Sequence, residues 1–522
     1  MIAQTKYRSI GELGVHTAHS GSIFMASKIA GGVVAVLLLV VTARLLQPID
    51  YGIFSVVIAF ANMLDIGGNF GIGTAVRQRL PDAMRHHPER VAPIILSGFY
   101  IVGTIALIIA LAGIILSGVI ANSVYHNQSM AVPIIIASAS VITTVLLNLM
   151  IIVLVSIDRV NQGSVVNLLY NVLMLIATPA LILAGYGVIG AVAAMIIGMG
   201  LGLLVGLYYL LKSVKFKAMG PDMKVSRDLA GYSVPVVVSH VAVNGAQNFA
   251  VLMLGVFAAS VLVGNYGAAF KMGRFGDLFI TSIGYVLLPA FTRVFADKNL
   301  AKRISDAFNT SLFYMVMFLV PIVTFGIASA IPLMRLLVGG TYSLAGGYFA
   351  VMAFGTIINV FGGIAGFIIL GYGNSKRFMI YQLAVVAIQL VLLALLVPSM
   401  QAVGALLALF VISPFAQAII YIYALERQFT ISVDYAQLAK LALSGIMVWA
   451  VTYAIGIAMH ESLASLAANL VVTILLYPPV LVYTKAVSKS NVEFVRRVQD
   501  RMKRVGFLAE YLVRYFELFM RA

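Results

Sequence analysis

The chain has 522 residues, of which 62% are hydrophobic and 10% are charged, and its formal net charge is +16. This composition excludes an ordinary water-soluble protein, because apolar runs of about twenty residues or more recur along the whole length. Cysteine is absent, which excludes disulfides, thiolate nucleophiles and cysteine metal sites. No Gly-Lys pair occurs, so the chain has no phosphate-binding P-loop and no internal ATPase.

The apolar segments are each long enough to cross a bilayer as a helix. They predict an all-α integral membrane protein with about fourteen transmembrane helices. Strand-like alternation is absent, which argues against a membrane barrel. In chain order, the expected spans start near Ser20, Tyr51, Ala92, Ala131, Ser164, Val188, Leu229, Leu262, Ile304, Ala345, Phe378, Ala402, Ala436 and Leu463.

Basic residues concentrate in every second connecting segment. If the N-terminus is cytoplasmic, the external ends hold only Arg44 and Arg335, and the spans hold Lys28, Lys271 and Arg274. This asymmetry follows the positive-inside rule, so we expect a multi-pass protein of the cell (cytoplasmic) membrane with both termini in the cytoplasm. The net charge then reflects topology, and no nucleic-acid partner is expected.

Four short matches indicate an internal repeat. "ASKIA" at Ala26, "IDYGIFSVV" at Ile49, "VNQG" at Val160 and "VIGAVAAM" at Val188 pair in order with "VSHVA", "GNYGAAFKM", "GNSK" and "AVGALLAL" at nearly one separation. Because each repeat holds an even number of spans, the two should be parallel. The expected organisation is a cytoplasmic N-terminal segment (1–19), a six-helix bundle (20–212), a cytoplasmic linker (213–228), a second six-helix bundle (229–425), two additional transmembrane helices (435–487), and an amphipathic cytoplasmic tail helix (488–522).

Charged and polar side chains lie inside several expected spans. An ionised side chain at the bilayer centre costs about 2.5–3.5 kcal/mol even on the lenient insertion scale, so these residues should face protein or a water-filled cavity. Positive groups outnumber negative ones there, which suits an anionic ligand. The candidate substrate-binding residues are Lys28, His240, Asn244, Gln247, Asn248, Lys271 and Arg274, and the candidate charge-balancing or ion-coupling residues are Asp65 and Asp277.

Each candidate also has a structural interpretation. Lys28 could extend to the cytoplasmic interface without touching a substrate. Arg274 and Asp277 are three residues apart and could pair within one helix. His240 could be a packing residue, and Asp65 could neutralise a nearby cation instead of coupling an ion. The glycines at 198, 202 and 206 are expected to allow close helix packing.

The tract "TARLLQPIDYGIFSVVIAFANMLDIGGNFGIGTAVRQRLP" (Thr42–Pro81) resembles the first two spans of prokaryotic polysaccharide flippases. These are lipid-linked oligosaccharide transporters of the multidrug/oligosaccharidyl-lipid/polysaccharide (MOP) exporter superfamily. The resemblance implies a V-shaped pair of bundles around a central cationic cavity. It also implies that Lys28, Lys271 and Arg274 contact a pyrophosphate head group. Fourteen spans resemble the lipid-linked peptidoglycan-precursor flippases of that superfamily.

The expected function is therefore that of a flippase. It would move a polyprenyl-(pyro)phosphate-linked oligosaccharide from the cytoplasmic to the external leaflet by alternating access, for cell-surface glycan assembly. We expect no enzymatic activity, no cofactor and no metal. The expected partners are the anionic lipid-linked glycan, membrane lipids and glycan-assembly enzymes, with the chain acting as a monomer. Two alternatives remain open: a multidrug or ion-coupled exporter of the same superfamily, and an integral-membrane glycosyltransferase or polymerase.

Overall fold

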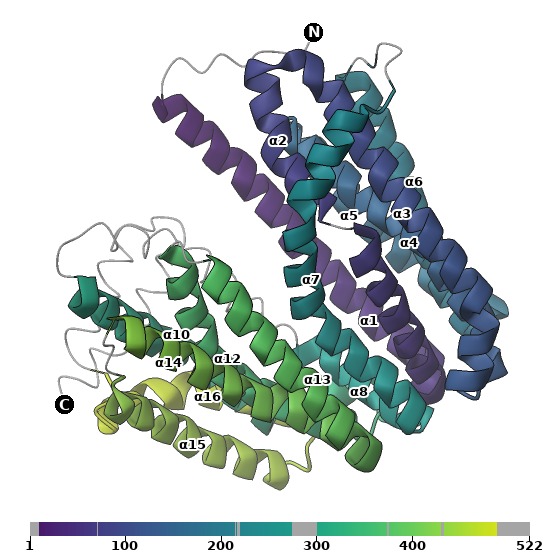
Figure 1. Cartoon of the computed structure of the whole chain (residues 1–522). Coiled ribbons are helices and arrows are strands. Elements are labelled where there is room, and N and C mark those ends of the chain that lie inside the picture. The colour runs from purple at the N-terminus through teal and green to yellow at the C-terminus, as the bar shows by residue number, and fades with distance from the viewer. Residues whose placement is uncertain are drawn as a thin grey trace. The chain divides into compact units, whose positions relative to one another are not determined.

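The computed structural model describes residues 10–69, 71–214, 216, 220–273, 300–372, 375–429 and 433–487 (Figure 1). Every regular element in these ranges is helical, as expected. The tail helix expected over 488–522 lies outside the described residues. The helices are α1 (Ile10–Asn69), α2 (Ile72–His86), α3 (Val91–Val119), α4 (Ala131–Ser156), α5 (Val160–Leu181), α6 (Gly187–Ser213), α7 (Met223–Phe257), α8 (Ser260–Gly273), α10 (Leu300–Ala328), α11 (Ala330–Val338), α12 (Ala345–Gly371), α13 (Ser375–Leu406), α14 (Ser413–Phe429), α15 (Tyr435–Ala458) and α16 (Leu463–Tyr483). Short 3₁₀ turns occupy Pro88–Arg90 and Gln128–Met130, and π turns occupy Ile120–Val124, Ile182–Tyr186 and Leu407–Ile412.

Within the described ranges, 9 helical segments are long and apolar enough to cross a membrane. Three of them, Ala30–Asn69, Val160–Ser213 and Lys376–Arg427, have 40, 54 and 52 residues. A single crossing takes about 20 residues, so each of these three accommodates two of the expected spans. The multi-pass membrane character is confirmed, while the total of fourteen spans stays a prediction.

The three long segments each break at a residue with positive φ. Gln47 has φ 62° and precedes Pro48, whose ring removes a backbone donor and restricts the residue before it. Gly187 has φ 50° and ψ −128°, and Gln401 has φ 50° and ψ −126°. Gly187 and Gln401 directly precede the matching segments "VIGAVAAM" and "AVGALLAL". The backbone therefore turns in the same way at corresponding places of the expected repeat.

The shared conformation predicts opposite effects of two substitutions. This part of φ/ψ space costs a residue with a Cβ on the order of 1–3 kcal/mol, so Gln401→Gly should raise the thermal midpoint and Gly187→Ala should lower it. A Cβ at Gly187 would meet nothing within 4 Å, so its effect reports the backbone alone. The protein is heated to a series of temperatures, and size-exclusion chromatography then gives the fraction that is still monodisperse. Shifts in the same direction for both variants would contradict the shared conformation.

The chain forms two compact units, and each is described by itself. The first unit comprises Met1–Ala268 with Leu393–Ala405. In it, α4 packs against α3 and α6, and α5 packs against α1 and α6 (Figure 1). The glycines at 198, 202 and 206 of α6 face Met174, Tyr170 and Met150, which confirms their expected packing role. Helix α7 packs in this unit against α1, α2 and α3. The division of the sequence into two six-helix bundles stays a prediction.

The second unit comprises Ala269–Leu392 with Leu406–Ala522. Helices α10, α12, α14, α15 and α16 share one apolar core that includes Phe308, Val360 and Leu481. Helix α16 is also joined by polar contacts to α10 and to Ser329, which directly follows α10. Tyr477 donates a hydrogen bond to the backbone oxygen of Met317 at 2.8 Å, and Asn469 Nδ2 donates to Ser329 Oγ at 3.1 Å. The two additional helices are therefore an integral part of this unit.

Helices α1 and α8 cross at two glycines within the first unit. A Cβ on Gly52 would overlap the carbonyl oxygen of Ser260, and a Cβ on Gly264 would overlap the carbonyl oxygen of Pro48. The contact is reciprocal: each helix presents a glycine to a carbonyl that lies four residues before the other helix's glycine. Close approach of two backbones at small residues is the usual way in which helices associate in lipid.

The reciprocal contact also bears on the register of the repeat. The contact pairs Gly52 with Gly264. These two glycines are as far apart in the sequence as "ASKIA" and "VSHVA" are. The alignment of "IDYGIFSVV" with "GNYGAAFKM" instead pairs Tyr51 with Tyr266, which is three residues out of step. Both tyrosines are fully buried. If the two helices are equivalent parts of the expected repeat, the contact geometry favours the alignment that pairs Gly52 with Gly264 over the one that pairs Tyr51 with Tyr266.

The crossing predicts that neither glycine tolerates a side chain. Gly52→Ala and Gly264→Ala should each destabilise the protein by about 1–3 kcal/mol, because the helices must separate to admit a Cβ. Gly118→Ala on α3 is the matched control, since a Cβ there would meet nothing within 4 Å. The thermal midpoints of the three purified variants test this. Equal midpoints for Gly52→Ala and Gly118→Ala would exclude the close crossing.

Candidate functional site

The lysine inside the first expected span is held by α5. Lys28 Nζ donates a hydrogen bond to Asn167 Oδ1 at 3.0 Å. Asn167 Nδ2 donates to the backbone oxygen of Ser27 at 3.4 Å, and Asn171 Nδ2 donates to the backbone oxygen of Asn167 at 2.6 Å. Asn167 is buried. The ammonium group therefore has a fixed partner within the first unit.

A glycine makes room for these amides. Gly31 lies three residues after Lys28 on α1, so the two share one side of the helix. A Cβ at Gly31 would lie 3.3 Å from the side-chain nitrogens of both Asn167 and Asn171. The two asparagines are four residues apart and face the same way on α5. The local sequence thus brings a cation and two amides together at the α1–α5 contact.

A second cation acts on Lys28. Arg77 of α2 is close enough for its positive charge to repel the Lys28 ammonium. The acceptor of this Lys28 hydrogen bond is a neutral amide, which orients the ammonium. A bound anion would relieve this repulsion and could use the hydrogen-bond donors that Arg77 and Lys28 provide.

The acidic candidate Asp65 lies further along α1. Its Oδ1 atom is enclosed and has no hydrogen-bond partner among the described residues. Three residues earlier, Asn62 Nδ2 donates to Asn248 Oδ1 of α7 at 3.2 Å. The polar face of α1 therefore meets α7 at an amide pair. An enclosed carboxylate oxygen of this kind is a place for a proton or a cation.

The structure describes the remaining candidates to different extents. Gln247 is half-buried on α7, next to Asn248, and Lys271 is half-buried on α8 in the second unit. His240 and Asn244 lie in α7, and the structure describes only their backbone. Arg274 and Asp277 also lie outside the described residues. The structure brings together Lys28 with Asn167, and Asn62 with Asn248, and it leaves the pairing of Arg274 with Asp277 as a prediction.

Sequence reasoning did not single out Asn167 and Asn171. The signal was present, because two amides four residues apart interrupt an apolar stretch and must share a helix face. Their partner on α1 could not be read from the sequence. Among the described residues, no group of three or more His, Asp or Glu is placed to hold a metal ion.

Comparisons with known proteins place the chain in a family. The family model described as "Polysaccharide biosynthesis protein" matches residues 18–295, which is more than half of the chain. The chain belongs to this family. The comparison with curated proteins finds no match.

Solved structures show the fold of the chain. The lipid II flippase MurJ in its inward closed conformation is similar with a TM-score of 0.72 and 14% identity, covering 88% of this chain and 98% of that chain. An inward-facing MATE-family multidrug resistance transporter of the MOP superfamily has a TM-score of 0.58 and 15% identity, covering 78% and 94%. A mutant of a Vibrio cholerae MATE transporter has a TM-score of 0.52 and 16% identity, covering 79% and 98%. The chain therefore has the fold that these solved structures share.

The Lys28 contact predicts how a substitution in α5 acts on the lysine. Asn167→Ala should weaken the fold by on the order of 1–2 kcal/mol, because it removes the acceptor of a charged donor. It should also raise the rate at which Lys28 reacts with an amine-directed reagent, measured by mass spectrometry of the purified protein. Asn161→Ala, an exposed asparagine on the same helix, is the matched control. An unchanged Lys28 reaction rate in Asn167→Ala would rule out the positioning contact.

Proposed function

We propose that this protein is a flippase that moves a polyprenyl-(pyro)phosphate-linked oligosaccharide from the cytoplasmic to the external leaflet by alternating access. The observation that carries the proposal is the placement of Lys28. It is a cation in an expected span, oriented by a neutral amide and repelled by Arg77. Such a group attracts an anion, and the phosphates are the charged part of a lipid-linked glycan.

The proposed substrate contacts follow from the chemistry of the candidate residues. Lys28, Lys271 and Arg274 would replace the water around the phosphate groups, as charge-assisted hydrogen-bond donors do. Asn244, Gln247 and Asn248 would bind sugar hydroxyls, which accept and donate hydrogen bonds as amides do. His240 is the proposed equivalent of Lys28 in the second repeat. Asp277 would hold Arg274 in position until the substrate arrives.

The energetics permit this transport without ATP. The membrane potential is worth about 2.3 kcal/mol per charge per 100 mV, and an inside-negative potential drives an anionic head group outward. Asp65 would mainly balance the cations of the site, and its enclosed oxygen also suits a coupling ion. The orientation with both termini cytoplasmic is part of the proposal and rests on the positive-inside rule.

The equal backbone turns at Gly187 and Gln401 and the reciprocal contact of Gly52 with Gly264 support two related halves. Parallel repeats of this kind are one architecture of alternating-access transporters. Six spans in each of 20–212 and 229–425, with two more in 435–487, remain part of the proposal.

The second candidate is an exporter of cationic drugs or an ion-coupled exporter. The enclosed carboxylate of Asp65 favours it, because a cation pump needs buried acidic groups. The cationic surroundings of Lys28 argue against it. A glycosyltransferase or polymerase is not proposed, because the solved structures that share this fold carry the names of a flippase and of transporters.

The decisive experiment is transport in proteoliposomes of known orientation. A fluorescent polyprenyl-pyrophosphate oligosaccharide placed in the leaflet that contacts the predicted cytoplasmic face should cross to the other leaflet. Lys28→Gln should slow transport about tenfold or more, since a hydrogen bond to a charged group is worth about 1.5–3 kcal/mol. Lys440→Gln, which removes an exposed charge from α15, is the matched control. Orientation is read from labelling of a single cysteine placed at the exposed Arg85.

Three results would each count against one part of this proposal. Normal glycan transport by Lys28→Gln would remove the proposed head-group site. Transport of a fluorescent organic cation with no glycan transport would favour the exporter. Restored transport in the double mutant Arg274→Ala, Asp277→Ala, relative to Arg274→Ala alone, would make those residues a structural pair instead of a substrate site.

A further inference from the structure

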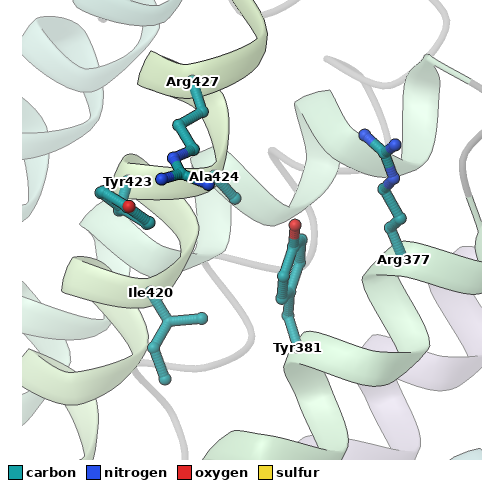
Figure 2. Close-up of a pocket in the computed structure, with 6 residues that line it drawn as sticks. All are labelled: Arg377, Tyr381, Ile420, Tyr423, Ala424 and Arg427. Atoms are coloured by element: carbon teal, nitrogen blue, oxygen red, sulfur yellow. The ribbon is translucent and has the colours of Figure 1, made fainter.

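A pocket opens between α13 and α14 in the second unit. Its volume is about 610 Å³, and it is lined by Arg377, Tyr381, Ile420, Tyr423, Ala424 and Arg427 (Figure 2). None of these residues belongs to the proposed transport site. The volume is within the usual range of about 300–1,000 Å³ for small-ligand sites.

Helix geometry places the two arginines at the same end of the pocket. Arg377 lies in the first turn of α13, and Arg427 lies in the last turn of α14. Figure 2 shows both guanidinium groups at one end, with Tyr381 between them and Ile420 toward the other end. Tyr381 follows Arg377 by four residues, so the two share a face of α13. The pocket is thus basic at the helix ends and apolar deeper in.

Aromatic rings contact the side chains at the basic end of the pocket. The guanidinium carbon of Arg427 lies 5.1 Å from the centre of the Tyr423 ring, a cation–π contact. The Tyr381 ring lies 6.2 Å from that of Tyr421, which is buried and donates a hydrogen bond to Gln382 Oε1 at 2.7 Å. An arginine stacked on a ring keeps its planar N–H edge available, and that edge matches the oxygens of a phosphate.

The outer wall of the pocket continues into an exposed apolar stripe. Phe415, Ile419 and Tyr423 follow one another at four-residue spacing on α14 and are 50%, 67% and 55% exposed. In a membrane helix such a stripe faces lipid. A ligand at this place could therefore put an anionic group on the arginines and a hydrocarbon chain along the stripe. A free inorganic anion would use only the first of these features.

We propose that this pocket binds the phosphate head group of an anionic membrane lipid, whose chain lies along Phe415 and Ile419. Basic pockets between membrane helices near the cytoplasmic surface are a known form of lipid recognition. With the proposed topology, the lipid is in the cytoplasmic leaflet. The bound lipid would be a resident partner of the second unit and not the transported substrate.

The test uses the full-length protein in detergent. Binding of phosphatidylglycerol is counted by native mass spectrometry, with phosphatidylcholine of the same chains as the neutral lipid. The double variant Arg377→Gln, Arg427→Gln should bind phosphatidylglycerol about 25-fold more weakly, or about fivefold per arginine, and Arg→Lys at both sites should keep part of the affinity. Tyr423→Leu preserves the apolar stripe and should weaken binding about two- to fivefold through loss of the cation–π contact.

The matched control is Arg85→Gln, Arg90→Gln, which removes the same charge from exposed arginines in the first unit. It should leave phosphatidylglycerol binding unchanged. Equal loss of binding in the control and pocket variants would reduce the effect to general surface charge and overturn the proposal. Complete displacement of the lipid by millimolar inorganic phosphate would make the site one for a free anion, and equal affinity for phosphatidylcholine would exclude head-group recognition. The test measures lipid binding and not glycan transport. Its outcome therefore does not depend on whether the flippase proposal holds.

Discussion

The hydrocarbon core of a bilayer offers no hydrogen-bond partners, so a chain that crosses it must pair its own backbone N–H and C=O groups. Helices meet this requirement within one segment, and every regular element among the described residues is helical. Three of the long helical segments break at residues with positive φ, namely Gln47, Gly187 and Gln401. The same constraint acts on side chains, because a polar group within the membrane needs a partner. Asn167 supplies one to Lys28, and Asn248 supplies one to Asn62.

Lipid also removes the usual driving force for helix association, since a lipid tail is as apolar as a leucine side chain. Close contact then has to come from small residues. The glycines of α6 let α5 and α4 approach, and Gly52 and Gly264 let two backbones cross in a reciprocal contact. Polar contacts join α16 to α10 at Tyr477 and to Ser329, directly after α10, at Asn469. Small residues and isolated hydrogen bonds therefore take the place that a water-driven apolar core has in soluble proteins.

Lys28 and Arg427 are two basic groups whose supporting contacts differ. Lys28 is oriented by a neutral amide in an expected span, and its environment contains another cation. Arg427 is supported by an aromatic ring at a helix end, beside an exposed apolar stripe. Lys28 carries a compact ammonium group that an amide orients. A planar guanidinium stacked beside a lipid-facing surface suits a ligand that stays at the interface. This difference in chemistry separates the proposed substrate contact from the proposed lipid site.

The sequence by itself determined the helical membrane class, the order of the spans in the described ranges, the packing role of the α6 glycines and the family. These properties follow from local hydropathy, spacing and motif, which act over one or two helices. It also predicted that Lys28 and Asp65 lie inside spans.

Only the tertiary structure decided that Lys28 meets Asn167, that Asn62 meets Asn248, that Gly52 and Gly264 share one crossing, and that Arg377 and Arg427 line one pocket. These pairs join residues far apart in the chain, and which helix faces meet is set by the packing of all neighbouring helices together. A span's own periodicity shows which residues share a face, but it does not show which other span that face will contact.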